Sequence, residues 1–170
     1  MNELQKYYTK FSIEGIQFTI IATPKGIREI IFNLDDSSDK LKGSVLVKPD
    51  DAQMHNIHSQ LLEYFKGERR IFNLPMEIQG TEFQKKVWNE LLKIPYGKTI
   101  TYKKLAERLG NLKSIRAAAH ANGVNPLAIV IPCHRVIGSD GSLVGYGGGL
   151  YIKEKLLEIE GGREPSLFNS

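Results

Sequence analysis

The chain has 170 residues, 41% of them hydrophobic and 25% charged, with a formal net charge of +4, an ordinary globular balance for one domain or two small ones. No apolar run approaches the roughly 20 residues that span a bilayer, and the N-terminus lacks the apolar stretch of a secretory signal, so we expect a soluble cytoplasmic protein without membrane attachment. The single cysteine excludes intramolecular disulfides and any zinc site built from several thiolates.

The first part of the chain predicts a small sheet followed by a helix. Residues 7–33 are rich in β-favouring side chains, and Gly15 and residues 23–26 are turn signals, so this region predicts a meander or hairpin sheet. After a polar, turn-rich stretch, residues 50–66 carry apolar side chains at helical spacing, and Gly67 is expected to end the helix.

An extended linker is expected next. Residues 71–80 contain Pro75 and show no helical periodicity, which is typical of a connection between two subdomains. We therefore expect an N-terminal α/β scaffold domain over residues 1–79 and a C-terminal domain over residues 80–170.

From Thr81 onward the pattern becomes helical. Thr81 and Gln84 match a capping box, in which each side chain accepts a hydrogen bond from the other residue's backbone N–H. The helix that follows carries one apolar stripe, which we expect to face the core: Phe83, Val87, Trp88, Leu91 and Leu92.

Two further helices match the helix-turn-helix pattern: residues 102–109, a turn with Gly110, and a helix that starts at Ser114. Thr101 and Ser114 are the expected N-caps. The segment 81–123 carries nine Lys/Arg against three Asp/Glu, whereas the rest of the chain is near neutral. A localised basic surface is typical of a phosphate-bearing partner, although a solvated helical face has the same composition.

The last part of the chain carries the candidate chemistry. Residues 127–131 form a continuous apolar run that predicts a buried strand, and Cys133 follows it beside His134. A nearby base would raise the fraction of nucleophilic thiolate, and a bridging water could join these adjacent side chains. Glu160 follows a helix over residues 150–159, where the helix dipole disfavours a carboxylate, so it is a candidate for orienting His134. The alternatives are an inert buried cysteine and a solvated carboxylate.

The sequence IPCHRV at residues 131–136 resembles the active-site hexapeptide of the O6-alkylguanine-DNA alkyltransferases, also called methylated-DNA–protein-cysteine methyltransferases. The similarity runs from about Phe83 to Gly161 with matching spacing, through Phe83-Gln84, Val87-Trp88, Pro95-Tyr96-Gly97, Thr101-Tyr102, Arg116-Ala117, Asn125-Pro126 and residues 146–150. It implies an α/β (α+β) fold class. The N-terminal domain would be ribonuclease-H-like, with a small sheet and a helix, and the C-terminal domain mostly helical and winged helix-turn-helix-like.

The resemblance also implies roles for single residues. Cys133 would be the alkyl acceptor, His134 the base that activates it through a water, and Glu160 the carboxylate that orients His134. Asn125 would hold the active-site turn, and Tyr102 would help to rotate the nucleotide and polarise the purine. The base pocket would be formed by Val136, Tyr146, Gly147, Gly148 and Lys153. Besides Tyr102, DNA contacts would come from Arg116, which would enter the base stack, and from Lys103, Asn111, Ser114, Ala117, Arg135 and Ser139.

The implied function is DNA repair by direct reversal. The partner would be double-stranded DNA carrying O6-alkylguanine, with O4-alkylthymine as an open second substrate, and no metal or organic cofactor would be required. Because a thioether is not a leaving group and the chain has no second thiol, Cys133 would be used once per molecule. We expect a monomer in solution and leave cooperative binding to DNA open.

The sequence departs from the family pattern in two respects. Gly147 stands where some members carry a serine, which leaves the preferred size of the alkyl group open. His55 and His58 lack the cysteines of the zinc site of some relatives, and we interpret them as surface residues.

Three other functions are alternatives to alkyl transfer. An alkyltransferase-like damage sensor would lack Cys133. A transcription regulator would leave the nucleophile segment unexplained, and a cysteine hydrolase would leave the basic helix-turn-helix without a purpose.

Overall fold

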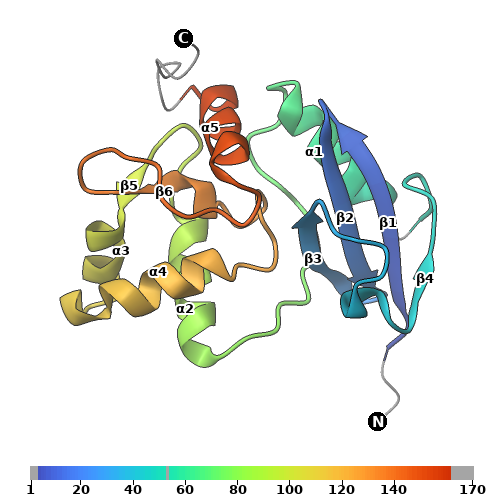
Figure 1. Ribbon diagram of the computed structural model, residues 1–170, viewed down its shortest axis with the longest axis horizontal. Helices are drawn as coiled ribbons and strands as arrows, with labels where there is room; N and C mark the ends of the chain where they lie inside the picture. Colours follow the sequence, from blue (N-terminus) through green and yellow to red (C-terminus); the bar gives the residue numbers. More distant parts are fainter. Residues whose placement is uncertain (1–3, 53, 162–170) are drawn as a thin grey trace. The chain divides into compact units, whose positions relative to one another are not determined.

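The computed structural model describes residues 4–52 and 54–161, which fall into two compact units, one up to residue 79 and one from residue 80 onward (Figure 1). Each unit is described by itself. No helix among the described residues is long and apolar enough to cross a membrane.

The N-terminal unit contains a four-stranded mixed sheet with the strand order β3-β2-β1-β4. The first three strands form the expected antiparallel meander: β1 (Lys6–Ile13), β2 (Ile16–Thr23) and β3 (Gly26–Phe32). After the short helix η1 (Asp39–Leu41), β4 (Ser44–Leu46) pairs in parallel with β1. Gly15 has a φ of 81° at the β1–β2 turn, a conformation that glycine adopts without strain.

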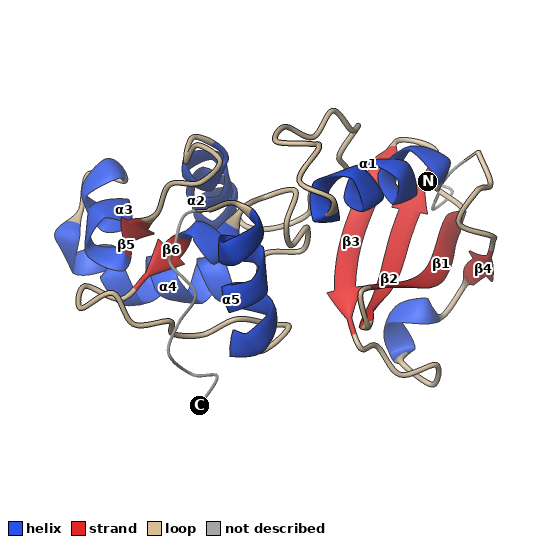
Figure 2. Ribbon diagram, turned by 90° about the horizontal axis from the view of Figure 1, so that it is seen from above, coloured by secondary structure: helices blue, strands red, loops and turns tan. Residues whose placement is uncertain are grey.

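Helix α1 (His55–Phe65) covers one face of this sheet (Figure 2). Its buried face includes Tyr64 and Phe65, and the Phe65 ring lies 5.8 Å from the ring of Phe18 in β2. The expected start of the helix at residue 50 is wrong, because Asp51 instead accepts backbone hydrogen bonds that close turns ahead of the helix. His55 is exposed, as interpreted from the sequence, whereas His58 is half-buried with its ring 4.5 Å from the Phe11 ring.

The extended segment before residue 80 is tied to β3. Ile27 N–H donates to the Pro75 carbonyl (2.9 Å), and Glu77 N–H donates to the Ile27 carbonyl (2.9 Å). A Cβ on Gly26 would lie 2.5 Å from the Pro75 carbonyl oxygen, so only glycine allows this close approach. The segment is therefore part of the N-terminal fold and not a free linker.

The C-terminal unit begins with α2 (Glu82–Leu92), and the predicted capping box between Thr81 and Gln84 is confirmed, with both hydrogen bonds present. Val87, Trp88 and Leu91 are buried, and Trp88 Nε1 donates to the Ala121 carbonyl (2.9 Å). Phe83 and Leu92 are exposed, which corrects the prediction that the whole stripe faces the core.

The helix-turn-helix consists of α3 (Tyr102–Arg108), the short helix η2 (Leu112–Ser114) and α4 (Ile115–Gly123). Thr101 caps α3 as predicted, because its hydroxyl accepts from Lys104 N–H. Ser114 occupies the N-cap position of α4 as predicted, but its side chain makes no capping hydrogen bond. Its hydroxyl donates to the Asn111 carbonyl (2.6 Å), while the Asn111 side chain caps η2.

The apolar run at residues 127–131 is a tight turn and not the expected buried strand. Ile131 N–H donates to the Leu127 carbonyl (2.8 Å), and Ile129 has a φ of 74°. A β-branched residue rarely adopts this conformation, at a cost of about 1–3 kcal/mol. Burial of the run's apolar side chains stabilises the turn against this cost.

Three short elements complete the C-terminal unit. The 3-10 helix η3 (Cys133–Arg135) follows the turn and leads into β6 (Val136–Ile137), which pairs in parallel with β5 (Ile100–Thr101). A glycine-rich loop then connects to α5 (Leu150–Ile159). Helices α3 and α4 lie at one end of the unit and α5 at the other (Figures 1 and 2).

Candidate active site

Cys133 is the first residue of η3, and only 5% of its surface is exposed. Burial raises the pKa of its thiol, while the Asn125 side chain, the charge of Lys153 and nearby backbone N–H groups oppose that rise. The resting group is therefore a thiol, and a nucleophilic thiolate requires a base to remove its proton.

The neighbouring histidine has the environment of such a base. His134 is fully buried, and its Nε2 lies 2.7 Å from Glu160 Oε1. Burial lowers the pKa of His134 more than the contact with Glu160 raises it, so the neutral ring is favoured. A neutral ring that donates Nε2–H to Glu160 carries its lone pair on Nδ1, and that atom can accept a proton.

Arg135 completes a buried ionic network with the same carboxylate. Its Nε donates to Glu160 Oε2 and its Nη2 to Glu160 Oε1, each at 2.9 Å, and its Nη1 donates to the Ile94 carbonyl at 2.6 Å. The guanidinium also lies 5.8 Å from the centre of the Tyr96 ring. The expectation that Arg135 contacts DNA does not fit this geometry, because the side chain is buried and bound to protein acceptors.

Glu160 is held as a carboxylate by this network. Burial alone would raise its pKa, but the hydrogen bonds and charges of His134 and Arg135 outweigh burial and lower the pKa to about 2. Gly97 N–H donates a further bond to Oε2 (3.2 Å). The solvated carboxylate considered from the sequence is therefore excluded.

Asn125 holds the turn that precedes the cysteine. Its Nδ2 donates to the Ile131 carbonyl (2.7 Å), and its Oδ1 accepts from Leu127 N–H (2.9 Å). The two bonds bridge the start and the end of the turn that contains Ile129, so the side chain fixes the backbone immediately before Cys133.

Lys153 and Tyr102 join the glycine-rich loop to this cluster. Lys153 is fully buried, and its Nζ donates to the carbonyls of Val136 (2.6 Å) and Val144 (3.0 Å). Burial lowers its pKa to about 8, and the nearby Cys133 opposes that shift. The Tyr102 hydroxyl donates to the same Val144 carbonyl (3.1 Å), and Lys153 Nζ lies 5.9 Å from the Tyr102 ring.

The other expected pocket residues differ in exposure. Val136 is buried and Tyr146 is half-buried, with a hydroxyl whose pKa burial raises well above its usual value. Gly147 is exposed, and a Cβ built on it would meet no atom within 4 Å. Gly148 is half-buried.

Sequence reasoning missed Asn122, a buried residue of α4 whose Nδ2 lies 3.4 Å from the carbonyl oxygen of Cys133. No local signal singles it out, because an asparagine near a helix end is common for reasons of capping alone.

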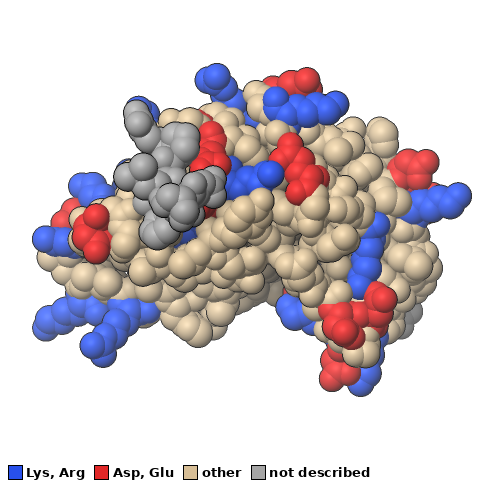
Figure 3. Space-filling view, turned by 45° about the horizontal axis from the view of Figure 1, so that its top comes forward, with Lys and Arg blue, Asp and Glu red and all other residues tan. Residues whose placement is uncertain are grey.

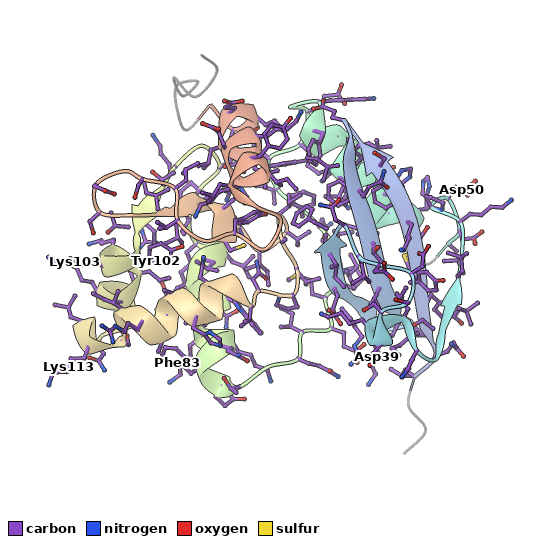
Figure 4. The ribbon with its side chains drawn as sticks, in the orientation of Figure 1. Asp39, Asp50, Phe83, Tyr102, Lys103 and Lys113 are labelled. Atoms are coloured by element: carbon purple, nitrogen blue, oxygen red, sulfur yellow. The ribbon has the colours of Figure 1, made fainter. Side chains whose placement is uncertain are left out.

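Most of the expected DNA contacts lie on the surface: Lys103, Asn111, Arg116, Ala117 and Ser139 are exposed. Figure 4 shows Lys103 and Lys113 projecting from the outer side of the helix-turn-helix, whereas Tyr102 lies on its inner side. Basic side chains, with acidic ones among them, project from this end of the C-terminal unit (left in Figure 3). Within residues 4–52 and 54–161, no three His, Cys, Asp or Glu side chains gather in a way that could hold a metal ion.

Two family models match the chain. Residues 6–78 match the ribonuclease-like domain of 6-O-methylguanine DNA methyltransferase, and residues 82–162 match its DNA-binding domain. The methylated-DNA–protein-cysteine methyltransferase of Methanosarcina acetivorans is 47% identical over 71% of this chain and 81% of that protein. The inducible enzyme of the same name from Bacillus subtilis is 38% identical over 91% and 83%, respectively.

Solved structures agree with these matches. The crystal structure of the Mycobacterium tuberculosis O6-methylguanine methyltransferase superposes with a TM-score of 0.85 at 34% identity, covering 95% of this chain and 96% of that one. A structure of the M. tuberculosis protein in complex with DNA gives a TM-score of 0.82, also at 34% identity, covering 94% and 96%. The expected α+β fold class is confirmed, and the chain belongs to the methylated-DNA–protein-cysteine methyltransferase family.

Proposed function

We propose that this protein repairs DNA by direct reversal, moving the alkyl group of O6-alkylguanine onto Cys133 in one irreversible step. The observation that carries the proposal is the buried series Cys133, His134 and Glu160, in the same compact unit as a basic helix-turn-helix. The relatives' names describe the same methyl transfer to a protein cysteine, and one relative was solved in complex with DNA.

The chemistry begins with loss of the Cys133 proton to His134 through a bridging water. Glu160 stabilises the resulting imidazolium, and a positioned base of this kind contributes about 10²–10⁴-fold to a rate. The Cys133 thiolate attacks the alkyl carbon as the bond from that carbon to O6 breaks. The electron pair stays on the guanine, which takes up the proton that Cys133 released to His134, so the products are a thioether on Cys133, unmodified guanine and a neutral His134.

The O6 atom lies inside the base stack, so the nucleotide has to rotate out of the duplex before transfer. We assign Arg116 to the vacated position in the stack and Tyr102 to the rotated nucleotide. Exposed lysines of the helix-turn-helix would supply contacts to phosphates. Since one compact unit holds all of these groups, we propose that a single copy of the chain acts on DNA. We also propose that it acts in the compartment that contains the chromosome, where this substrate occurs.

A damage sensor without transfer activity is not favoured, because Cys133 is present and lies beside a buried His134–Glu160 pair. The two functions predict different products. A sensor would leave the alkyl group on the DNA, whereas a transferase would carry it away.

Incubation with duplex DNA containing O6-methylguanine, followed by intact-mass measurement, tests the proposal. We expect each protein molecule to gain one methylene unit at most, with peptide mapping placing it on Cys133. Cys133→Ser should bind the same duplex without gaining mass. An unmodified wild-type protein that still binds the lesion would support the sensor and overturn the transferase.

A further inference from the structure

The C-terminal end of α5 determines where the Glu160 carboxylate lies, because Glu160 is the residue that follows the last turn of this helix. The last four carbonyl groups of a helix have no partners within the helix, and helix ends fray. A frayed end of α5 would move the carboxylate away from His134 Nε2, which it contacts at 2.7 Å. The groups that hold this helix end therefore bear on the base.

The turn over residues 95–98, between α2 and β5, binds this end of α5. The Tyr96 hydroxyl donates to the carbonyl of Ile159, the last residue of the helix, at 3.1 Å. Gly97 N–H donates to Glu160 Oε2 at 3.2 Å. Two neighbouring residues of the turn thus bind two neighbouring residues of the helix end, across 63 positions of sequence.

Gly97 allows this close approach because it has no side chain. Its φ is 76°, which glycine adopts without strain, and an added Cβ would lie 2.9 Å from the Glu160 carbonyl oxygen. A larger residue would push the helix end away from the turn or distort the turn itself.

The same region of the chain also binds the cation that pairs with Glu160. Arg135 Nη1 donates to the carbonyl of Ile94, immediately before the turn, at 2.6 Å, and the guanidinium lies 5.8 Å from the centre of the Tyr96 ring. Arg135 itself donates two hydrogen bonds to Glu160. The carboxylate that contacts His134 is therefore held by the turn both directly and through Arg135.

We propose that Tyr96 and Gly97 are positioning residues for alkyl transfer, which hold Glu160 where it orients His134 and stabilises the imidazolium. They act through Glu160 and are not catalytic residues themselves. This inference rests on the proposed alkyl transfer. It predicts that the Tyr96 hydroxyl contributes to the rate only while residue 160 is a carboxylate.

Tyr96→Phe removes the hydroxyl and keeps the ring beside Arg135. The rate of Cys133 benzylation by free O6-benzylguanine, followed by intact mass, reports on the transfer without DNA binding. We expect a loss of about 5-fold, the equivalent of one hydrogen bond. Tyr151→Phe, at a tyrosine of α5 that is 71% exposed, is the matched control and should keep the wild-type rate.

A double-mutant cycle separates positioning from a general loss of stability. In the Glu160→Gln background, Tyr96→Phe should change the benzylation rate by less than about 2-fold, because the effects of residues in one network are not additive. The proton that His134 Nε2 donates to Glu160 gives a second readout. Its ¹H NMR signal should shift in Tyr96→Phe and keep its position in Tyr151→Phe.

Gly97→Ala tests the close approach independently. We expect it to slow benzylation by about 10-fold or more, because a small displacement of a catalytic group has a large effect on the rate. Gly67→Ala is the matched control: Gly67 has a φ of 74°, and a Cβ built on it would meet no atom within 4 Å. This variant carries a similar backbone strain and should keep the wild-type rate.

A wild-type rate in Tyr96→Phe would overturn the inference, and so would an equal fold loss in the Glu160→Gln background or an unshifted His134 proton. Tyr96→Phe keeps the inference testable even where Gly97→Ala does not fold. If the wild type modifies neither O6-benzylguanine nor methylated DNA, the proposed transfer itself fails, which is a different result from any of these.

Discussion

Glu160 Oε1 lies 2.7 Å from His134 Nε2, in a contact that joins side chains 26 residues apart and excludes solvent. The same carboxylate accepts two hydrogen bonds from Arg135, which is permanently charged. Because Arg135 already balances the negative charge, His134 can remain neutral and available as a base. A proton taken up by His134 then adds a second cation beside the carboxylate that accepts its Nε2–H.

This arrangement predicts that Glu160→Gln slows alkylation strongly while DNA binding persists. An amide still bonds His134, but it lacks the charge that stabilises the imidazolium, so we expect the single-turnover rate to fall about 100-fold. The uncompensated charge of Arg135 should also lower the free energy of unfolding by about 3–5 kcal/mol. Rates therefore have to be measured well below the melting temperature of the variant.

Glu158→Gln is the control for this change, because Glu158 is an exposed carboxylate on the same helix, α5. We expect this control to keep the wild-type rate and stability. An unchanged alkylation rate in Glu160→Gln would remove Glu160 from the mechanism.

Glu160 should also make the fold sensitive to acid. Its pKa falls from a usual value of 4.5 to about 2 on folding, so the folded protein binds fewer protons than the unfolded chain between these values. The stabilisation is complete above pH 4.5 and is lost as the pH falls through 2, an effect of about 3 kcal/mol in total. Urea unfolding should show that the difference in the free energy of unfolding between wild type and Glu160→Gln shrinks by about 2 kcal/mol from pH 7 to pH 3. A constant difference would contradict the lowered pKa.

Local chemistry explains which parts of the fold could be predicted from the sequence. The capping box of Thr81 and Gln84 and the cap by Thr101 depend on neighbours within three residues, and both are present as predicted. The meander around Gly15 follows from strand alternation and a turn residue in the same way.

The errors lie where distant residues decide the structure. The apolar run around Ile129 has the composition of a strand, but the Asn125 side chain and burial of the run hold it as a turn. Arg135 has the positive charge expected of a DNA contact. Its side chain is nevertheless held in the interior by two hydrogen bonds to Glu160, the residue that follows α5. The contact of Asn122 with the Cys133 carbonyl joins two separate elements, which periodicity cannot indicate.

Lys153 should make the free energy of unfolding depend on pH in the alkaline range. Burial lowers its pKa from 10.5 to about 8, so above pH 8 the folded protein releases a proton that the unfolded chain still binds. Wild-type stability should therefore rise with pH through this window, by about 1 kcal/mol between pH 7 and pH 9. Lys153→Met removes the titrating group and should lack this gain. Denaturant titrations of both proteins at the two pH values measure this gain in stability. If the stabilities of wild type and Lys153→Met change in parallel with pH, Lys153 keeps its usual pKa.

Arg116 should matter for duplex DNA and not for the transfer step itself. It is exposed on the first turn of α4, the second helix of the helix-turn-helix, and its position is outside the buried Cys133–Glu160 network. We expect Arg116→Ala to slow repair of O6-methylguanine in a duplex by about 10-fold or more, because unstacking a base costs a few kcal/mol that the guanidinium would offset. Reaction with free O6-benzylguanine, which needs no unstacking, should stay within about 2-fold of wild type.

Arg116→Lys separates stacking from charge. A lysine keeps the positive charge and the salt dependence of DNA binding, but it lacks the planar group that can occupy a gap between bases. We therefore expect its duplex repair rate to lie near that of Arg116→Ala, with a salt slope near that of wild type. Full recovery of the duplex rate by lysine would assign Arg116 to a phosphate contact, and equal losses on duplex and free base would place its effect inside the active site.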